Sequence, residues 1–329
     1  MKRIAINGFG RIGRLTLRNL LNNPNVEVVA INDLTDNATL AQLFKFDSSQ
    51  GKFQGTVSAT DEAIIINGKK ILCYAVKNPN ELPWAALNID TVLECTGIFL
   101  DKPKAGLHLQ AGAKRVILSA PPKENDIPTV VLGTNEHILE NTSEQIISNA
   151  SCTTNCLAPL VKIINDNFGI EKGFMSTIHA YTSDQRIQDA PHKDWRRART
   201  AANNIIPTST GAAKALKTVI PEIGSKISAS SLRVPVAAGS VVELICLLQK
   251  PATVETVNAH FKSAAEGHLK GILEYSTDEL VSTDIIGNTH SSIFDANLTQ
   301  LHDGLLKVTS WYDNEAGYSA RLAELAAKF

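Results

Sequence analysis

Residues 3–23 read RIAINGFGRIGRLTLRNLLNN, and the architecture of the first half of the chain can be worked out from this stretch. It opens with a short apolar run, passes through three glycines and continues with Ile12, Leu15 and Leu20 on one helical face. A second apolar run, VEVVAIND, follows at 26–33. A strand, a helix and a strand in this order predict a βαβ unit.

The three glycines, Gly8, Gly10 and Gly13, have the spacing G-x-G-x-x-G directly after the first strand and at the start of the helix. Asp33 ends the second strand, 20 residues beyond Gly13. Glycines let the backbone approach a pyrophosphate, the helix N-terminus attracts its charge, and the carboxylate accepts from a ribose hydroxyl. A tight turn without a ligand is the alternative, but the full context favours a dinucleotide site.

Two further apolar runs continue this pattern, DTVLECTG at 90–97 and RVILSA at 115–120. They are almost continuously apolar, as strands are when both faces of a parallel sheet are covered. Between them, Ala105 and His108 suit a helix that closes at Gly112. We therefore expect an α/β domain with a doubly wound parallel sheet over residues 1–150.

After residue 150 the pattern changes to a long polar stretch at 181–204 and then to strands in succession. The strand-like runs are 231–236, 240–249 and 305–312. Successive strands predict a mixed α/β domain with a largely antiparallel sheet over residues 151–313. The last segment, 314–329, has helical periodicity, and we expect it to dock on the first domain.

The composition excludes several classes of protein. The formal charge of the 329 residues is −1, so no overall field favours nucleic acid or a membrane as the primary partner. The N-terminal apolar stretch is too short for a secretory signal, and no run approaches the ~18 apolar residues of a membrane span. Five cysteines without CxxC spacing indicate reduced thiols in the cytoplasm, with no disulfide framework and no metal site.

One of these cysteines has polar neighbours. Residues 148–156 read SNASCTTNC, and an apolar helical face follows, which places Cys152 at or near a helix N-terminus. The helix dipole there favours the thiolate of a nucleophile, although an inert thiol is an equal alternative. Pro159 removes a backbone donor, so the helix either starts late or bends. Cys156 lies one turn further on and is interpreted as a packing residue.

A thiol nucleophile needs a base, and the chain has eight histidines. His179 ends an apolar run in STIHAYTSD and is followed by hydroxyl and charged residues. An isolated histidine is more often structural than catalytic. The sequence separation alone does not show whether His179 meets Cys152.

Seven segments together resemble the glyceraldehyde-3-phosphate dehydrogenase family. They are INGFGRIGR, SNASCTTNCLAP, HAYTSDQRI, KDWRRAR, PTSTGAAKA, LRVPV and WYDNEAGYS. The resemblance runs along the whole chain. It implies a Rossmann-type NAD-binding domain completed by the C-terminal helix, a mixed α/β catalytic domain, and a homotetramer.

The resemblance also implies roles for individual residues. Cys152 matches the nucleophile and His179 its base, and the oxidised aldehyde is glyceraldehyde 3-phosphate. The residues that match the NAD contacts are Gly8, Gly10, Arg11, Ile12, Gly13, Asp33, Lys77, Ser119 and Asn314. Those that match the site of the substrate phosphate are Thr182 and Arg233. Those that match the site of the attacking inorganic phosphate are Ser151, Thr153, Arg199, Thr210 and Gly211.

Two features of the polar stretch qualify this assignment. Arg196 and Arg197, beside Arg199, are interpreted as a solvated basic face or a subunit contact. Ala190 stands where many NAD-specific members of the family carry leucine, which leaves the strictness of NAD over NADP open.

Among the cofactor candidates, Lys77 stands where the family often has arginine. Little change in the NAD contact is expected, because the resemblance implies a contact through the backbone.

Three alternatives remain on the sequence alone. Erythrose-4-phosphate dehydrogenase shares the nucleophile and cofactor, although PTSTGAAKA matches the phosphorylating triose enzymes. Aspartate-semialdehyde dehydrogenases pair a similar nucleotide domain with a cysteine but lack SNASCTTNC followed by this basic stretch. A non-catalytic role in RNA binding or adhesion has no support from the net charge near zero. The physiological direction, glycolytic or gluconeogenic, is not decided by the sequence.

Overall fold

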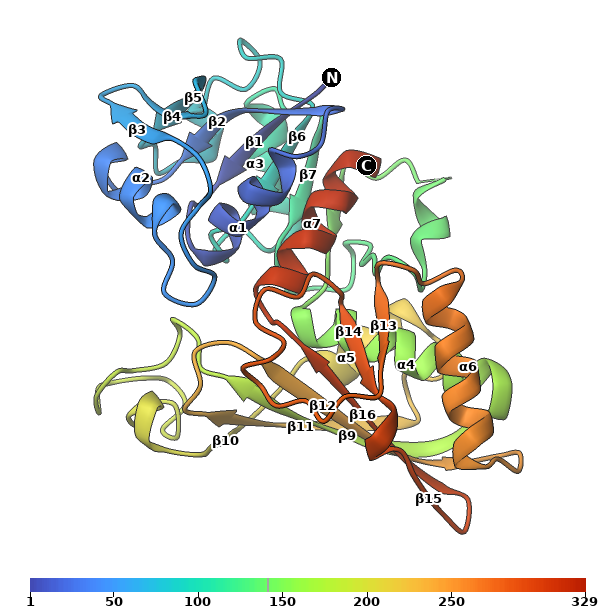
Figure 1. Ribbon diagram of the computed structural model, residues 1–329. Coiled ribbons are helices and arrows are strands. Elements are labelled where there is room, and N and C mark those ends of the chain that lie inside the picture. Colours follow the sequence, from blue (N-terminus) through green and yellow to red (C-terminus); the bar gives the residue numbers. More distant parts are fainter. Residues whose placement is uncertain (141) are drawn as a thin grey trace. The chain divides into compact units, whose positions relative to one another are not determined.

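The computed structural model describes residues 1–140 and 142–329. The chain forms two compact units (Figure 1). The first consists of residues 1–130, 137–150 and 319–329, and the second of residues 131–136 and 151–318. Each unit is built on its own sheet.

The first unit contains eight strands among the described residues. They are β1 (Lys2–Asn7), β2 (Val26–Asn32), β3 (Val57–Thr60), β4 (Ala63–Ile66), β5 (Lys69–Tyr74), β6 (Thr91–Glu94), β7 (Arg115–Leu118) and β8 (Ile146–Ser148). The α-helices that start within it are α1 (Arg11–Leu20), α2 (Asn37–Lys45) and α3 (Lys102–Gln110). Two 3₁₀ turns, η1 (Pro79–Glu81) and η2 (Glu136–Leu139), complete the regular structure of this region.

The strand order is β3-β4-β5-β2-β1-β6-β7-β8, and β1 pairs in parallel with both β2 and β6. From β1 the chain moves to β2 on one side and later to β6 on the other, which makes the edge beyond β1 a topological switch point. The predicted βαβ unit and doubly wound sheet are confirmed, with strands that end one to three residues earlier than expected.

One part of this sheet is not parallel. Strand β4 pairs antiparallel with both β3 and β5. The sequence contains the signal, because the two residues between β4 and β5 are Asn67 and Gly68, both with positive φ (49° and 79°). An Asn-Gly pair is the preferred two-residue turn of a β-hairpin. The sequence analysis did not identify this hairpin.

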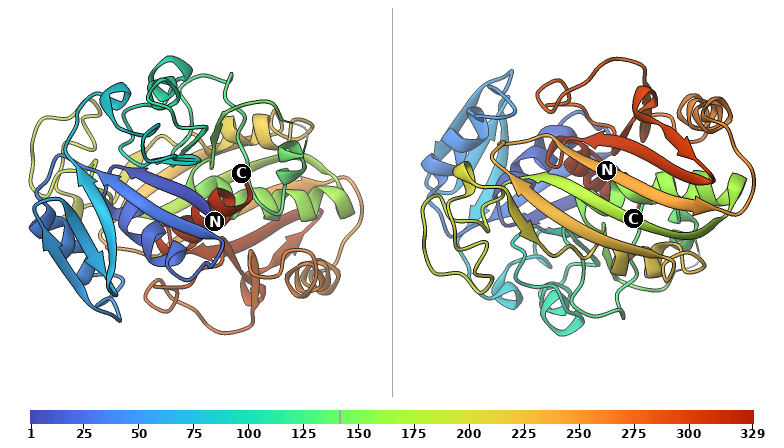
Figure 2. Two further views of the ribbon diagram at one scale, coloured as in Figure 1. Left: turned by 90° about the horizontal axis from the view of Figure 1, so that it is seen from above. Right: turned by 90° about the horizontal axis from the view of Figure 1, so that it is seen from below.

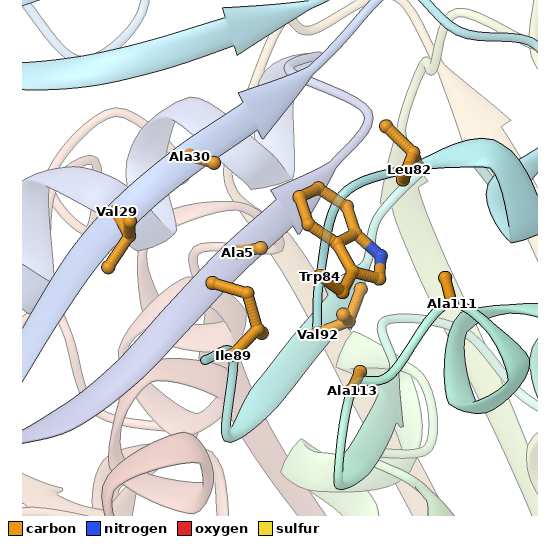
Figure 3. Packing of buried hydrophobic residues seen from close by; sticks show 9 residues of the cluster. All are labelled: Ala5, Val29, Ala30, Leu82, Trp84, Ile89, Val92, Ala111 and Ala113. Atoms are coloured by element: carbon orange, nitrogen blue, oxygen red, sulfur yellow. The ribbon is translucent and has the colours of Figure 1, made fainter. Parts of the chain in front are cut away.

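Trp84 is the centre of a buried cluster in the first unit (Figure 3). Its ring is fully buried among small and branched side chains from the sheet and the segments beside it. Those shown in the figure are Ala5, Val29, Ala30, Leu82, Ile89, Val92, Ala111 and Ala113. The alanines leave room for the indole, so burial of this ring contributes a large part of the local apolar stabilisation.

The second unit contains the other eight strands of the described chain. They are β9 (Ile170–Ala180), β10 (Ile206–Thr208), β11 (Ile227–Val234), β12 (Ser240–Leu248), β13 (Leu273–Ser276), β14 (Ser292–Asp295), β15 (Gln300–His302) and β16 (Leu305–Tyr312). The helices are α4 (Cys152–Phe168), α5 (Ala212–Val219) and α6 (Val254–Glu266), with 3₁₀ turns η3 (Ala201–Asn203) and η4 (Ala296–Leu298).

The sheet order is β10-β11-β9-β12-β16-β14-β13, with β15 added beside β16. The four strands β11, β9, β12 and β16 lie side by side in the view from below (Figure 2, right). Five of its seven pairings are antiparallel, which confirms the prediction of a largely antiparallel sheet. Helix α4 packs on this sheet with α5 and α6 beside it (Figure 1). The sheet therefore has one face covered by helices.

The chain ends in α7 (Ala316–Lys328), whose residues from 319 onward belong to the first unit. Lys2 Nζ donates to the carbonyls of Ala326 and Ala327 at 3.2 and 3.0 Å. These carbonyls end the helix, so the lysine satisfies acceptors that lack an intrahelical partner. Within the described ranges no helix is long and apolar enough to cross a membrane, and no group of three metal-ligating side chains gathers.

Candidate active site

The N-terminus of α4 presents the cysteine of the SNASCTTNC segment. Ser151 is the N-cap, and its side chain accepts a hydrogen bond from Thr154 N at 3.1 Å. Cys152 is the first helical residue and is half-buried. Pro159 lies inside the helix, which nevertheless begins at Cys152, so of the two alternatives that Pro159 left open the late start is excluded. The strong serine cap offers one physical reason for an early start.

His179 reaches the same place from the sheet. It is next to last in β9, and its Nε2 lies 3.4 Å from the Sγ of Cys152. The two residues are 27 positions apart in the chain, and the packing of α4 on the sheet brings them together. A thiol and an imidazole within hydrogen-bonding distance are the arrangement that covalent catalysis by cysteine requires.

Arg233 stands beside this pair because β11 and β9 are aligned so that Arg233 is opposite His179. Two groups meet Nδ1 of His179, the carbonyl oxygen of Ala180 at 2.7 Å and Nη1 of Arg233 at 2.6 Å. A carbonyl only accepts and a guanidinium only donates, so the two contacts favour opposite tautomers. The surroundings of His179 therefore support a proton on either ring nitrogen.

The charges of this site follow from burial. Burial raises the pKa of the Cys152 thiol, and the positive charge of Arg233 is the largest influence that lowers it. Burial, followed by the charge of Arg233, lowers the pKa of His179 to about 3. The backbone N–H groups of Cys152 and Thr153 at the helix start also lower the pKa of the thiol, but desolvation outweighs these influences in the net direction.

Tyr312 packs against His179 and contacts Thr153, and it was not identified as a site residue from the sequence. Its hydroxyl lies 2.9 Å from Thr153 Oγ1 and 2.8 Å from Thr177 Oγ1, and its ring meets the imidazole of His179 edge-on at 5.9 Å. Burial raises the pKa of Tyr312 well above its usual value. This neutral phenol fixes the threonine after the cysteine and limits the rotation of the imidazole.

Two residues of the second unit, Gln185 beside Thr182 and Arg233 beside His179, have a buried donor without a partner in the part of the chain that the structure describes. Gln185 accepts a hydrogen bond from Thr182 N at 3.3 Å, and its buried Nε2 has no hydrogen-bond partner among the described residues. The buried Nε of Arg233 has none either within that part of the chain. Unpaired buried donors cost free energy unless a ligand satisfies them, so they fit an anion that binds here.

Arg197 does not lie on the solvated basic face that was one of the two alternatives for it and Arg196. Arg197 donates to Asp184 at 2.6 Å and to Thr208 at 2.8 Å, and only 20% of its side chain is exposed. It is therefore not a solvated cation. Burial is the main cause that lowers the pKa values of His179 and Arg233, and the charge of Arg197 adds to it in both.

Arg199, matched to the inorganic phosphate, is 63% exposed and pairs with Asp189 at 2.7 Å. Arg196 is exposed. Thr210 and Gly211 precede α5, and Thr210 Oγ1 accepts from Ala212 N at 3.2 Å. The resemblance singled out Arg199, and the burial of Arg197 could not be foreseen, because a run of basic residues in an irregular segment carries no periodicity.

The glycine loop of the first unit has the geometry that its motif predicts. A Cβ on Gly8 would lie 2.7 Å from Thr96 N, and a Cβ on Gly13 would lie 2.3 Å from Gly8 O, so neither position has room for a side chain. Gly10 differs, because no atom of the described residues lies within 4 Å of its Cβ position. It begins α1 without a side-chain cap. The open space at Gly10 and this helix start form a cradle for an anion.

Asp33 follows β2 at the same edge. Its two carboxylate oxygens accept from Phe9 N at 2.8 Å and from Thr35 N at 3.0 Å. This fixes the carboxylate beside the glycine loop, and each oxygen keeps a lone pair for a hydroxyl.

The remaining cofactor candidates divide between the two units. In the first unit, Arg11 pairs with Asp47 at 2.5 Å, Ile12 is half-buried in α1, Lys77 is exposed, and Ser119 N donates to the carbonyl of Glu94 at 2.9 Å. In the second unit, the buried Asn314 accepts from Ser240 Oγ at 3.0 Å.

Comparison with known proteins adds a family. Residues 2–102 match the family model for the glyceraldehyde 3-phosphate dehydrogenase NAD binding domain, and residues 151–314 match the model for the C-terminal domain. Curated relatives that bear the name glyceraldehyde-3-phosphate dehydrogenase are similar along their whole length. The protein of Clostridium pasteurianum is 53% identical over 335 residues, which cover 100% of this chain and 98% of the relative.

Two further relatives give the same result. The protein of Mycolicibacterium smegmatis is 56% identical over 333 residues (99% of this chain and 97% of the relative). That of Geobacillus stearothermophilus is 53% identical over 326 residues (99% and 97%). The thiol–imidazole pair, the glycine loop and these similarities agree, and the chain belongs to the glyceraldehyde-3-phosphate dehydrogenase family.

Proposed function

We propose that this chain catalyses the phosphorylating oxidation of D-glyceraldehyde 3-phosphate to 1,3-bisphosphoglycerate with NAD. The observation that carries the proposal is the 3.4 Å contact between Cys152 Sγ and His179 Nε2 at the start of α4. Residues 1–150 with 314–329 would bind the cofactor, and residues 151–313 would carry the chemistry.

Cys152 supplies the nucleophile and His179 handles the proton. The sulfur adds to the aldehyde carbon and forms a thiohemiacetal, while the thiol proton passes by way of Nε2 of His179 to the new alkoxide, which leaves the imidazole neutral. When the carbon loses a hydride, His179 takes the hydroxyl proton, and a thioester remains on Cys152. Inorganic phosphate then attacks the thioester carbon, and the thiolate leaves. One hard oxidation is thus divided into two easier steps.

The two phosphates have candidate sites in the second unit. For the substrate phosphate we propose Thr182 and Arg233, supported by the unpaired Arg233 Nε and by Gln185 Nε2 beside Thr182. The proposed ligands of inorganic phosphate are Ser151, Thr153, Thr210, Gly211 and Arg199. We add Arg197 to this set, because its charge acts on His179 and Arg233 and its guanidinium already contacts Thr208.

The residues of the first unit fit NAD. Gly10 leaves space at the helix start for the pyrophosphate, and the fixed carboxylate of Asp33 suits a ribose hydroxyl. NAD, when bound, accepts the hydride. Asn314 of the second unit, together with Arg11, Ile12, Lys77 and Ser119, completes the proposed cofactor set.

We also propose a homotetramer in the cytoplasm. Phe174 and Ile245 form a cross-strand pair with 49% and 39% of their surfaces exposed, while Met175, next to Phe174, is fully buried. An apolar sheet face of this kind is typical of a contact with another copy. All five cysteines are free thiols, which suits a reducing compartment.

An assay of NADH absorbance with glyceraldehyde 3-phosphate tests the proposed function. We expect steady turnover that requires inorganic phosphate, and a single turnover per Cys152 when phosphate is omitted, because the thioester then accumulates. Erythrose 4-phosphate serves as the competing substrate. Faster oxidation of erythrose 4-phosphate, or no difference with and without phosphate, would contradict the proposal.

A further inference from the structure

Glu94, the last residue of β6, carries a carboxyl group that is fully buried in the first unit. Thr96 donates to Oε1 through its backbone N at 2.8 Å and through its hydroxyl. Asn7 Nδ2 and His108 Nε2 reach Oε2 at 2.6 and 3.0 Å. None of the proposed catalytic steps uses this group, although burial of a carboxylate without a cation is costly.

The direction of the contact with His108 follows from Trp84. The indole Nε1–H of Trp84 lies 3.0 Å from His108 Nδ1, and an indole nitrogen can only donate. Nδ1 of His108 must therefore accept, and a neutral ring then carries its proton on Nε2. The proton on Nε2 points at Glu94 Oε2. His108 is thus held as a neutral donor to the carboxylate.

The direction of the contact with Asn7 follows in the same way from Asn32. Asn32 accepts from Val76 N at 2.9 Å and donates to Val76 O at 2.9 Å, which fixes the orientation of its amide. Its Nδ2 also donates to Asn7 Oδ1 at 2.7 Å, which leaves Nδ2 of Asn7 to face Glu94. Every partner of the Glu94 carboxyl group is therefore a donor, and only the ionised form accepts all of them.

The residues held by this network adjoin the glycine loop. Asn7 and Asn32 end β1 and β2, directly before Gly8 and Asp33. The backbone of Gly8 packs so closely on Thr96 that a Cβ on Gly8 would lie 2.7 Å from Thr96 N. The N–H of that same Thr96 peptide donates to Glu94. The carboxylate therefore fixes the peptide against which the backbone of Gly8 packs.

We propose that Glu94 is a positioning residue for the dinucleotide. As a buried anion it holds Thr96 and Asn7 in place, and through them it shapes the Gly8 loop that receives NAD. The inference rests on the proposed NAD-dependent function. It concerns the affinity for the cofactor, and the thiol chemistry of Cys152 lies outside it.

Glu94→Gln tests the proposal with little change of volume. In either orientation of the new amide, its N–H₂ group faces a donor. Asn7, His108 and the Thr96 peptide are fixed as donors and cannot become acceptors. We expect the Kd of NAD, measured by isothermal titration calorimetry, to rise roughly tenfold or more. The kcat at saturating NAD and the alkylation rate of Cys152 should stay within about twofold. Glu27→Gln, an exposed acid in the same unit, is the control and should change neither.

A second substitution separates positioning from a general loss of structure. Asn7→Asp combined with Glu94→Gln moves the negative charge from Glu94 to its hydrogen-bond partner at position 7 and restores an acceptor for the donors around it. The carboxylate introduced at position 7 can accept from Asn32 and from the new amide, and His108 Nε2 lies 3.4 Å from the atom that becomes an oxygen. We expect the double variant to bind NAD within about threefold of the unaltered protein. Asn7→Asp alone places two carboxylates together, and it should bind NAD more weakly than Glu94→Gln alone or the double variant.

The outcomes separate this inference from the proposed function. Binding and turnover of NAD by the unaltered protein test the function, whereas the ratios between variants test the role of Glu94. An unchanged Kd in Glu94→Gln overturns the inference and leaves the function intact. If Glu94→Gln does not fold, the double variant decides, because a soluble protein with near-normal Kd supports the proposal and an insoluble or non-binding one overturns it.

Discussion

His108 in the first unit and His179 in the second are both buried, with 0% and 5% of their surfaces exposed, but their ring nitrogens have different partners. Nδ1 of His108 meets one donor, the indole of Trp84. Its Nε2 lies 3.0 Å from the acceptor Glu94 Oε2 and, at the longer distance of 3.4 Å, from Asn7 Nδ2. Nδ1 of His179 meets a donor and an acceptor at once, while its Nε2 faces a thiol. One ring therefore has a single allowed tautomer, and the other has two.

The difference separates a structural histidine from a reactive one. A ring that is fully satisfied in one tautomer is held in that tautomer, because the other one would break the buried hydrogen bonds at both ring nitrogens. A ring with competing partners at Nδ1 can exchange its Nε2 proton at lower cost. Burial alone does not distinguish the two residues, and the pattern of donors and acceptors does.

Of the two histidines only His179 contacts a thiol, and removal of that thiol should have the largest effect on activity. Cys152→Ser should lower aldehyde oxidation by at least ~10⁴-fold, because the hydroxyl is a poor nucleophile at neutral pH. NAD binding should persist. Cys156→Ser is the matched control, since Cys156 is fully buried, its Sγ lies 3.6 Å from Ser292 Oγ, and burial raises its pKa to about 12. Comparable activity of both variants in the NADH assay would contradict the assignment.

The same substitution at the two histidines tests the comparison directly. His179→Asn should lower kcat by ~10²–10⁴-fold, the usual contribution of a general base, and change the pH profile of Cys152 alkylation. His108→Asn should leave kcat at saturating NAD within a few fold. It should instead reduce the free energy of unfolding by about 2 kcal/mol, since Trp84 and Glu94 each lose a buried partner. Urea unfolding and steady-state kinetics measure both effects, and equal loss of kcat in both variants would refute the distinction.

Acid should destabilise the protein through His179. Its pKa is held near 3 in the folded state, below the ~6.5 of an unfolded histidine. Between these two pKa values the folded ring stays neutral while the unfolded ring gains a proton, which favours the unfolded chain. The contribution of the neutral His179 to the free energy of unfolding is therefore complete above about pH 6.5. It is lost as the pH falls toward 3.

At pH 4.5 this loss should amount to about 3 kcal/mol, or two pKa units at about 1.4 kcal/mol each. The quantity to measure is the difference in the free energy of unfolding between the unaltered protein and His179→Asn, at pH 7.5 and at pH 4.5. Subtraction removes the titration of other groups. If that difference is the same at both pH values, the folded pKa of His179 is not lowered.

At the nucleotide edge, where donors and acceptors are matched, selectivity should depend on Asp33. Its fixed carboxylate accepts from a ribose hydroxyl, and the 2′-phosphate of NADP removes that donor and adds a like charge. We expect NAD to be favoured by on the order of a hundredfold in kcat/KM. Asp33→Ala should narrow the ratio, chiefly by weakening NAD. Equal use of both cofactors by the unaltered protein would show that the small Ala190 matters more than the charge of Asp33.

The smallest expected effect separates Arg197 from Arg199. Arg197→Lys should raise the KM for inorganic phosphate by about tenfold, because lysine loses the forked contact to Asp184 and Thr208. Arg199→Lys should change it by about threefold or less, because the Arg199 side chain is exposed and paired with Asp189. If Arg199→Lys raises the KM for inorganic phosphate more than Arg197→Lys does, Arg199 binds the phosphate and Arg197 does not.

Several features of the protein were determined by the sequence itself. The β1–α1–β2 unit, the close approach of Gly13 to Gly8 O and the helix N-terminus near Cys152 depend on residues within a few positions of one another. Backbone sterics, helical periodicity and capping act over this range, so a local pattern is sufficient to predict them. The Asn67–Gly68 hairpin was also encoded locally, and its signal was overlooked.

The active arrangement was decided only by the tertiary structure. His179 meets Cys152 because α4 packs on the sheet, and Arg233 joins them because β11 pairs with β9 in one register out of several. Tyr312 arrives from β16, more than 130 residues after His179. The tautomers of both histidines depend on such distant partners. A sequence states which donors and acceptors exist, but only the folded chain determines which of them meet, because those contacts are set by the packing of whole elements.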